Sequence, residues 1–194
     1  MAPKLILTGF MATGKSAVAR AIARRLSWRL IDCDQRLAAQ SGKSIAEVFR
    51  AHGESHFRDL ECAIIQEIAD EDRRCPQCTN PLPAVIATGG GALLDARNFD
   101  ALSRAGVIIC LAARPEVIAR RAGPHAASRP MLAAGGKPLG ERIAELIDAR
   151  RDAYARAPIT IDTSDLSIEQ AADAAIAAYA EYAKTWAPSA PPPS

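Results

Sequence analysis

Short apolar runs rich in branched residues alternate along the chain with longer stretches in which apolar residues recur at helical spacing. Five of these runs are typical of buried parallel strands: Lys4–Thr8, Leu30–Asp34, Ala84–Thr88, Val107–Leu111 and Ile159–Thr163. Strands that alternate with helices predict an α/β fold, in which a five-stranded parallel sheet is covered on both faces. Ligands bind such folds at the carboxyl ends of the strands, so polar motifs in those positions are candidates for chemistry.

Local signals mark where some of the helices begin and end. Gly42 ends a short segment after the second strand, and the sequence Ser-x-x-Glu at Ser44 and Glu47 is a capping box at which a new helix begins. A long amphipathic helix is predicted over residues 54–71, with one face formed by Phe57, Leu60, Ile64 and Ile68. Phe57 and Arg58 therefore lie near the start of that helix.

Three segments fall outside the alternation of strands and helices. Residues 73–83 form an insertion that carries two cysteines, and residues 122–140 are long, Gly/Pro-rich and dotted with basic residues, which suits a mobile lid. Residues 187–194 form a Pro-rich tail that we expect to be disordered. The length of 194 residues predicts one domain, over residues 1–186, with the lid and the insertion inside it.

Composition narrows the class of protein. A hydrophobic content of 49% supplies one good core, and a net charge of +2 with 24% charged residues does not favour nucleic acid as a partner. The sequence contains no run of roughly 18 apolar residues, the length of a membrane span. We expect a cytoplasmic protein that acts as a monomer on a small molecule, without a membrane or nucleic-acid partner.

The five cysteines do not follow the pattern of a disulfide-stapled secreted domain. Cys33 and Cys110 fall in predicted strands and Cys62 in a predicted helix, where a free cysteine usually acts as a small buried apolar residue. Cys75 and Cys78 form a single CxxC in the insertion, without the other two ligands of a zinc site. We expect an ordinary surface loop there, with metal binding or redox chemistry as the alternatives.

A glycine-rich loop follows the first strand and leads into a helix. Gly9 to Ser16 fits the pattern GxxxxGK[ST], in which backbone N–H groups cradle phosphates, the lysine reaches the β- and γ-phosphates and the serine hydroxyl coordinates Mg2+. This setting predicts ATP binding with Mg2+ as cofactor. The expected ATP contacts in and beside the loop are Gly9, Ala12, Thr13, Gly14, Lys15, Ser16 and Ala17.

Two further polar motifs follow the second and third strands. Asp32 and Asp34 alternate at the end of the second strand and are expected to point to the same face, where one holds hydrated Mg2+ and the other accepts a hydroxyl proton. Gly89, Gly90 and Gly91 follow the third strand directly, so their backbone N–H groups can approach a second ligand closely. The two motifs predict an acceptor site beside the phosphate loop.

The segments "GFMATGKS", "IDCD", "FRDLE", "ATGGG" and "RPML", in this order and spacing, resemble shikimate kinase, and the resemblance covers Leu5 to about Ala183. It implies a P-loop NTPase three-layer sandwich with a five-stranded parallel sheet, a helical substrate-binding region and a mobile lid. It also implies transfer of the γ-phosphate of ATP to the 3-hydroxyl of shikimate, in the pathway to chorismate and the aromatic amino acids.

The resemblance also implies roles for the residues that bind the phosphates, Mg2+ and the acceptor. Lys15 and Ser16 match the phosphate and Mg2+ contacts, and Asp32 matches the acid that reaches the metal through water. Asp34 matches the residue that binds the shikimate hydroxyls and acts as base. Arg58 resembles the arginine that binds the substrate carboxylate, with Glu61 one helical turn away to orient it.

The remaining roles fall on glycines and on three arginines. Gly89, Gly90 and Gly91 match the glycines on the substrate side. Arg129 resembles the catalytic lid arginine that moves onto the transferring phosphate, where it also contacts ATP. Arg121 resembles the residue that stacks on adenine, with Arg120 as the alternative.

A second carboxylate-binding arginine and one loop position depart from the family pattern. Arg150 stands four residues before Tyr154, as the second carboxylate-binding arginine does, although Asp152 and Ala153 replace the usual Pro-Leu between them. Ala12 replaces a common glycine of the loop, so a positive φ at that position implies strain or altered nucleotide affinity.

Two other functions compete with this interpretation. A gluconate-kinase-like enzyme also acts on a substrate with a carboxylate and hydroxyls, but Phe57-Arg58 and the triple glycine favour shikimate. A catalytically silent nucleotide-binding regulator keeps the fold without turnover, and the retention of all the catalytic positions argues against it.

Overall fold

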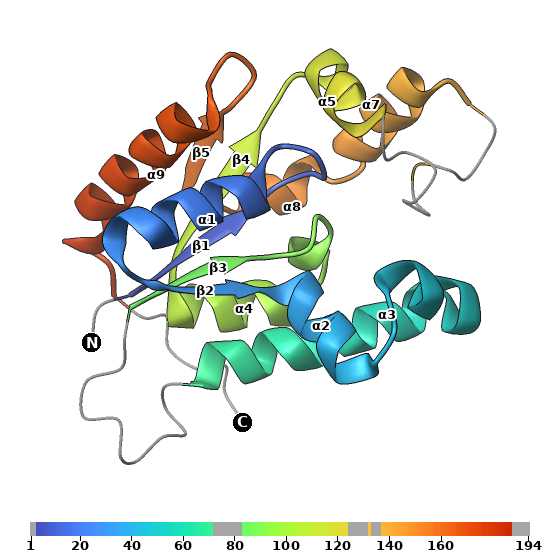
Figure 1. Cartoon of the computed structure of the whole chain (residues 1–194), viewed down its shortest axis with the longest axis horizontal. Coiled ribbons are helices and arrows are strands. Elements are labelled where there is room, and N and C mark those ends of the chain that lie inside the picture. Colours follow the sequence, from blue (N-terminus) through green and yellow to red (C-terminus); the bar gives the residue numbers. More distant parts are fainter. Residues whose placement is uncertain (1–2, 72–82, 124–131, 133–136, 188–194) are drawn as a thin grey trace.

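A computed structural model of the chain describes residues 3–71, 83–123, 132 and 137–187. Five strands form one parallel sheet in the order β2-β3-β1-β4-β5 (Figure 1). The strands are β1 (Lys4–Thr8), β2 (Arg29–Asp32), β3 (Ala84–Ala87), β4 (Gly106–Ala112) and β5 (Ile159–Asp162). The predicted α/β fold with five parallel strands is confirmed.

Helices cover both faces of the sheet, which makes three layers. They are α1 (Lys15–Leu26), α2 (Cys33–Ser41), α3 (Ile45–Asp70), α4 (Ala96–Ala105), α5 (Pro115–Ala122), α7 (Leu139–Asp148), α8 (Arg151–Ala155) and α9 (Ile168–Ala183), with a 3-10 turn, η2 (Ala92–Leu94). Helices α1 and α9 lie on one face, and α3 and α4 lie on the other (Figure 1). Helices α5 and α7 pack together beyond the carboxyl end of β4.

The apolar core lies on both sides of the central strand β1. Leu5 and Leu7 pack in the cluster under α1 and α9, and Ile6 packs in the cluster under α3 and α4; all three are fully buried. Because both faces of the strand need apolar side chains, its sequence is a continuous apolar run. A third cluster around Phe10 and Ile143 joins the phosphate loop to α5 and α7.

Helix α3 is built from two helical halves, as the sequence predicts. Its capping box is present, since the Ser44 hydroxyl accepts a hydrogen bond from the Glu47 N–H and the Ser44 N–H donates to the Glu47 carboxylate. Gly53, with φ 79° and ψ 178°, breaks the helix in the middle. The second half starts after this break and carries Arg58 in its first turns, over the carboxyl end of the sheet.

The predicted end of the second strand is wrong. We expect a strand to Asp34, but β2 ends at Asp32 and α2 begins at Cys33. The Asp32 carboxylate accepts hydrogen bonds from the N–H groups of Asp34 and Gln35, so it caps the helix. Because capping satisfies N–H groups that otherwise lack partners, the chain turns into a helix there. Asp32 and Asp34 therefore do not alternate on one strand, and Cys33 lies on a helix.

Several expectations fall outside the described residues. These are the insertion with Cys75 and Cys78, apart from Pro83, most of the expected lid with Arg129, and the expected tail, apart from Ala187. Cys33, Cys62 and Cys110 are buried and free, in agreement with structural roles. In the part of the chain that the structure describes, no helix combines the length and apolar character that crossing a membrane requires.

Candidate active site

The phosphate loop connects β1 to α1 and has the conformation that its glycines allow. A Cβ atom on Gly9, which has φ 125°, would lie 2.1 Å from the Leu111 carbonyl oxygen, so no other residue fits there. Gly14, at the N-cap of α1, has φ 100° and supplies no side-chain cap. The first N–H groups of α1 are thus left for an anion in the loop. Ala12 adopts φ 61°, so the positive φ considered for this position is present.

Lys15 and Ser16 are the first two residues of α1. Lys15 is 9% exposed, and its ammonium group donates hydrogen bonds of 2.8 Å to the carbonyl oxygens of Gly9 and Phe10. The Ser16 hydroxyl donates a 2.8 Å hydrogen bond to the Asp32 carboxylate. The Lys15 ammonium group and the two oxygens of the Ser16–Asp32 hydrogen bond thus lie at the N-terminus of α1. A helix N-terminus favours phosphates, and oxygen ligands favour a hard cation.

Asp34 reaches the site from the first turn of α2. It lies beyond the capping residue Asp32, and its carboxylate stays exposed. One carboxylate oxygen of Asp34 lies 3.1 Å from the position of a Cβ atom built on Gly89. The two acids therefore meet at the same end of the sheet as predicted, although the reason is a helix cap and not strand alternation.

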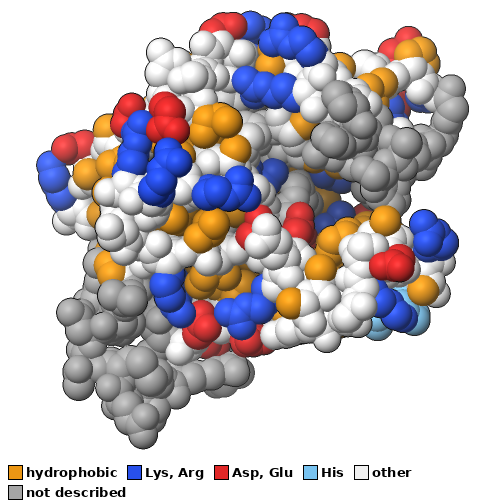
Figure 2. All heavy atoms as spheres, in the orientation of Figure 1, with side chains coloured by type: hydrophobic (Ala, Val, Ile, Leu, Met, Phe, Trp, Pro, Cys, Tyr) orange, Lys and Arg blue, Asp and Glu red, His pale blue; other side chains and the backbone are white. Residues whose placement is uncertain are grey.

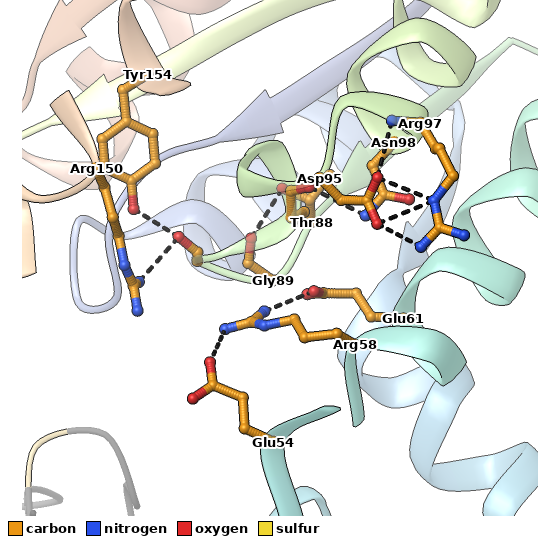
Figure 3. A network of polar contacts seen from close by, with 12 residues as sticks. Glu54, Arg58, Glu61, Thr88, Gly89, Asp95, Arg97, Asn98, Arg150 and Tyr154 are labelled. Atoms are coloured by element: carbon orange, nitrogen blue, oxygen red, sulfur yellow. Dashed lines mark hydrogen bonds and ion pairs between the residues drawn. The ribbon is translucent and has the colours of Figure 1, made fainter. Parts of the chain in front are cut away.

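Arg58 lies between two carboxylates of α3. Its guanidinium donates to Glu61 at 2.6 Å and to Glu54 at 3.1 Å (Figure 3). Burial lowers the pKa of Arg58, but the two carboxylates outweigh it and hold the pKa above its usual value. Burial has the opposite effect on the acid: it raises the pKa of Glu61, which is 3% exposed, and the charge of Arg58 opposes that rise. Glu61 orients Arg58, as the resemblance implies.

The glycine loop after β3 packs directly against these charged groups. A Cβ atom on Gly89 would lie 2.3 Å from a Glu61 carboxylate oxygen, and one on Gly91 would lie 2.5 Å from the Arg58 guanidinium. On the other side, a Cβ on Gly90 would lie 3.1 Å from the backbone nitrogen of Met11 in the phosphate loop. Glycine at these positions lets the backbone lie between the phosphate loop and Arg58.

Arg150, at the N-cap of α8, and Tyr154, within α8, approach the same loop. The Arg150 guanidinium donates a 3.3 Å hydrogen bond, and the Tyr154 hydroxyl a 2.5 Å hydrogen bond, to the Gly90 carbonyl oxygen. Figure 3 shows both side chains converging there. Arg150 is 4% exposed and also lies over the Phe10 ring, at 5.4 Å from its centroid. The structure thus places Arg150 beside the cavity despite the departures at Asp152 and Ala153.

Arg121 lies apart from this group, on α5. Its guanidinium donates to the hydroxyl of Thr163 at 3.2 Å and to the carbonyl of Thr163 at 2.8 Å. The Thr163 hydroxyl also lies 3.1 Å from the Thr13 carbonyl, so Arg121 is linked to the phosphate loop. Arg120 next to it is exposed. Of the two arginines, Arg121 is the one held at the loop.

One cavity of about 410 Å³ brings most of the predicted residues together. In Figure 2 the surface is hollowed on the side where α2 and the first half of α3 lie, with acidic and basic side chains along the hollow. The polar and glycine residues that line it are Gly14, Lys15, Ser16, Asp34, Arg58, Glu61, Thr88, Gly89, Gly90, Gly91 and Arg150. Phosphate-binding and acceptor-binding groups thus share one space.

Part of the apolar wall of the cavity and one hydroxyl above it were not identified from the sequence. Ile45, Phe49 and Phe57 line the wall. The first two are four residues apart, so helical periodicity could have paired them on one face. Tyr154 served only as a landmark for Arg150 in the sequence, because nothing local indicates that its hydroxyl reaches a carbonyl 64 residues away.

Comparisons with known proteins place the chain in one family. The family model described as shikimate kinase matches residues 11–180. A shikimate kinase of Caldanaerobacter subterraneus is 41% identical over 175 residues, which are 90% of this chain and 95% of that protein. A shikimate kinase of Geobacter metallireducens is 40% identical over 165 residues, which are 85% of each chain.

Solved structures show the same fold. A shikimate kinase from Acinetobacter baumannii in complex with shikimate has a TM-score of 0.82 and 25% identity over 94% of this chain and 95% of that one. A gluconokinase from Sinorhizobium meliloti, with a TM-score of 0.55 and 17% identity over 94% of this chain and 95% of that one, shares the fold alone. The chain therefore belongs to the shikimate kinase family and is a phosphotransferase of the aromatic amino acid pathway, a shikimate kinase.

Proposed function

We propose that the chain transfers the γ-phosphate of ATP to the 3-hydroxyl of shikimate, with both reactants in the 410 Å³ cavity. The observation that carries this proposal is that Lys15, a phosphate-binding residue, shares the cavity with two arginines, Arg58 and Arg150. A transfer needs donor and acceptor in contact. The relative from Acinetobacter baumannii, whose structure contains shikimate, supports the choice of acceptor.

On the acceptor side, the two arginines bind the carboxylate and Asp34 binds the hydroxyls. A guanidinium offers parallel N–H donors that match a planar carboxylate, and Arg58 is already oriented by Glu61. Asp34 is exposed and lines the cavity, so its carboxylate is accessible to the attacking hydroxyl and accepts its proton. Gly89, Gly90 and Gly91 close the acceptor site along the sheet edge.

On the nucleotide side, the loop residues hold the phosphates. Lys15 exchanges its bonds to the Gly9 and Phe10 carbonyls for the β- and γ-phosphates of ATP. Thr13 lies within the loop and Ala17 directly follows it. Arg121 supports the loop through Thr163 and stacks on adenine. Arg129, outside the described residues, supplies a further cation to the transferring phosphoryl group.

The residues present fit Mg2+, which prefers oxygen ligands and keeps several waters. The Ser16 hydroxyl and the Asp32 carboxylate lie 2.8 Å apart at the N-terminus of α1. Ser16 would bind the cation directly and Asp32 through water. When bound, Mg2+ neutralises charge on the β- and γ-phosphates.

The cell compartment and the assembly state are part of the proposal. We infer a cytoplasmic protein, because the three cysteines among the described residues are buried free thiols, as is usual in a reducing compartment, and we propose that it acts as a monomer.

A coupled assay of ADP release with shikimate, with gluconate and without acceptor tests the proposal. We expect shikimate-dependent turnover and only background rates with gluconate or without acceptor. NMR of the product then reports which hydroxyl carries the phosphate. Turnover with gluconate would support a gluconate-kinase-like enzyme, and no turnover with ATP binding intact would support a silent regulator.

A further inference from the structure

The Gly90 carbonyl oxygen lies where two parts of the proposed acceptor site meet. One part is the region of α8 with Arg150, and the other is α3 with Arg58. The carbonyl oxygen accepts the 2.5 Å hydrogen bond from the Tyr154 hydroxyl and the 3.3 Å hydrogen bond from Arg150, both from the region of α8. The two neighbouring glycines lie against the charged pair of α3, Gly89 against Glu61 and Gly91 against Arg58. One peptide group therefore lies between the arginines proposed to bind the carboxylate.

Among the described residues, one further side chain donates to this glycine loop: the Thr88 hydroxyl, at 3.2 Å from the Gly89 carbonyl oxygen. The carbonyl groups of the loop accept the N–H groups of Ala92 and Leu94, which form the turn η2. The backbone of Gly90 faces the phosphate loop at Met11, with no side chain between them. A loop of three glycines is intrinsically flexible, so a hydrogen bond from a side chain fixed in the core has a large effect on its position.

Tyr154 is suited to that task. Its ring is partly buried and packs against two buried apolar clusters, the one under α3 and α4 and the one around Phe10 and Ile143, so the hydroxyl has a fixed direction. Burial raises the pKa of Tyr154 to about 12, with the charge of Arg150 opposing the rise. The hydroxyl therefore remains protonated, and able to donate, at neutral pH.

We propose that Tyr154 is a positioning residue of the acceptor site, which holds the glycine loop through the Gly90 carbonyl and so fixes the distance between Arg150 and Arg58. The inference rests on the proposed function, because it assigns both arginines to the shikimate carboxylate. Tyr154 itself does not touch the reacting atoms. Its loss should weaken the binding of shikimate while the binding of ATP is kept.

The chain offers a matched control at the opposite end of the sheet. The Tyr179 hydroxyl also donates a 2.5 Å hydrogen bond to a backbone carbonyl, that of Pro3, which directly precedes β1. Its ring is buried in the core under α1 and α9. Tyr154→Phe and Tyr179→Phe thus remove the same kind of bond, from a ring packed against apolar side chains, one beside the cavity and one far from it.

The test compares kcat, the KM for shikimate and the KM for ATP in the wild type and both variants. For Tyr154→Phe we expect the KM for shikimate to rise about tenfold, the factor that one lost hydrogen bond of ordinary strength gives, with the KM for ATP within about twofold of the wild type. For Tyr179→Phe we expect unchanged kinetics and a comparable loss of thermal stability. Amide exchange at Ala92 and Leu94 should accelerate only in Tyr154→Phe.

Each other outcome overturns the inference. Unchanged kinetics in Tyr154→Phe would show that the loop keeps its position without the hydroxyl. Equal increases in both KM values, or a Tyr154→Phe protein that fails to fold while Tyr179→Phe folds, would show a general structural role. The proposed function is tested separately, because it fails only if the wild type itself does not turn over shikimate.

Discussion

Arg58 donates a 2.6 Å hydrogen bond to one carboxylate oxygen of Glu61, while the other oxygen of Glu61 is buried without a hydrogen-bond partner among the described residues. An unpaired oxygen of a buried carboxylate is costly, so the strong interaction with Arg58 is needed to hold the charge there. The pair fixes the guanidinium at the cavity wall, next to Gly91. Arg58 therefore meets its ligand with a direction that is already set.

Replacing Arg58 by lysine should raise the KM for shikimate strongly and leave the KM for ATP nearly unchanged. A lysine keeps the charge but has no planar pair of N–H donors, so the clamp on the carboxylate is lost. Steady-state kinetics with each substrate varied in turn measures the effect. We expect an increase of about 10- to 100-fold in the KM for shikimate.

The methyl ester of shikimate gives a second arm to that experiment. Esterification removes the carboxylate charge and should impair the wild type, but it should add much less to the defect of Arg58→Lys, because both changes delete one interaction. The value of kcat/KM is measured for both acceptors with both proteins. Fully additive losses would mean that Arg58 does not bind the carboxylate.

Lys15→Ala should lower kcat at least about 10³-fold while the fold stays intact, because Lys15 supplies charge to the transferring phosphates. Lys4→Met is the matched control, since Lys4 is also buried and donates to two backbone carbonyls, those of Ile68 and Ala69. We expect this variant to lose stability and keep kcat. Circular dichroism and turnover are measured together, and near-normal kcat in Lys15→Ala would contradict the role of the phosphate loop.

Asp34→Asn should lower kcat by about 10²-fold or more, because asparagine keeps the size of the side chain but cannot accept the hydroxyl proton. The matched control is Asp59→Asn, an exposed acid on α3 that does not line the cavity. Single-turnover rates at saturating shikimate separate chemistry from binding. A rise in the KM alone would make Asp34 a binding residue and not the base.

Ala12→Gly should stabilise the protein by about 0.5–1 kcal/mol, because the backbone of Ala12 has φ 61° and glycine relieves this strain at a smaller cost in chain entropy. Ser27→Gly is the control, since Ser27 has φ 54° at the exposed end of α1, away from the nucleotide. Chemical unfolding should show a gain in both variants. Only Ala12→Gly should change the Kd for ATP, and a loss of stability in Ala12→Gly would disprove strain at this position.

The burial of Tyr154 predicts a dependence of stability on alkaline pH. Its pKa rises from a usual value near 10 to about 12 in the folded protein, so the unfolded chain releases the proton first. The contribution to stability is complete below pH 10 and is lost as the pH rises from 10 to 12, by up to about 3 kcal/mol. The free energy of unfolding should therefore fall more steeply over this range in the wild type than in Tyr154→Phe. Parallel curves would show that Tyr154 ionises equally easily in both states.

The sequence by itself determined the features that depend only on residues close together along the chain. The phosphate loop from Gly9 to Ser16 is contiguous, so its chemistry is visible without a fold. The capping box at Ser44 and Glu47 is equally local, and the apolar runs predict the strands because parallel strands are buried on both faces. Arg58 and the triple glycine belong to short motifs of consecutive residues, through which the resemblance to the family identifies them.

Competition between two local signals explains the wrong end predicted for the second strand. The apolar run before Asp32 favours a strand, and Asp32 itself favours a helix N-terminus. The cap prevailed, since its carboxylate accepts two N–H groups of α2. Sequence spacing alone does not decide whether the strand continues past Asp32 or a helix begins there. The outcome depends on whether the following residues pack as a helix.

Only the tertiary structure decided how the separate motifs are held together. Tyr154 and Arg150 reach the carbonyl of Gly90 across 64 and 60 residues of chain, and Thr163 links Arg121 to the phosphate loop. Contacts over such distances depend on the order of strands in the sheet and on the packing of α8. Every residue, moreover, has a backbone carbonyl, so the sequence does not indicate which carbonyl accepts a hydrogen bond from a distant side chain. The physical reason is that a short segment fixes its own chemistry, while the direction in which its side chains point is fixed by the core beneath it.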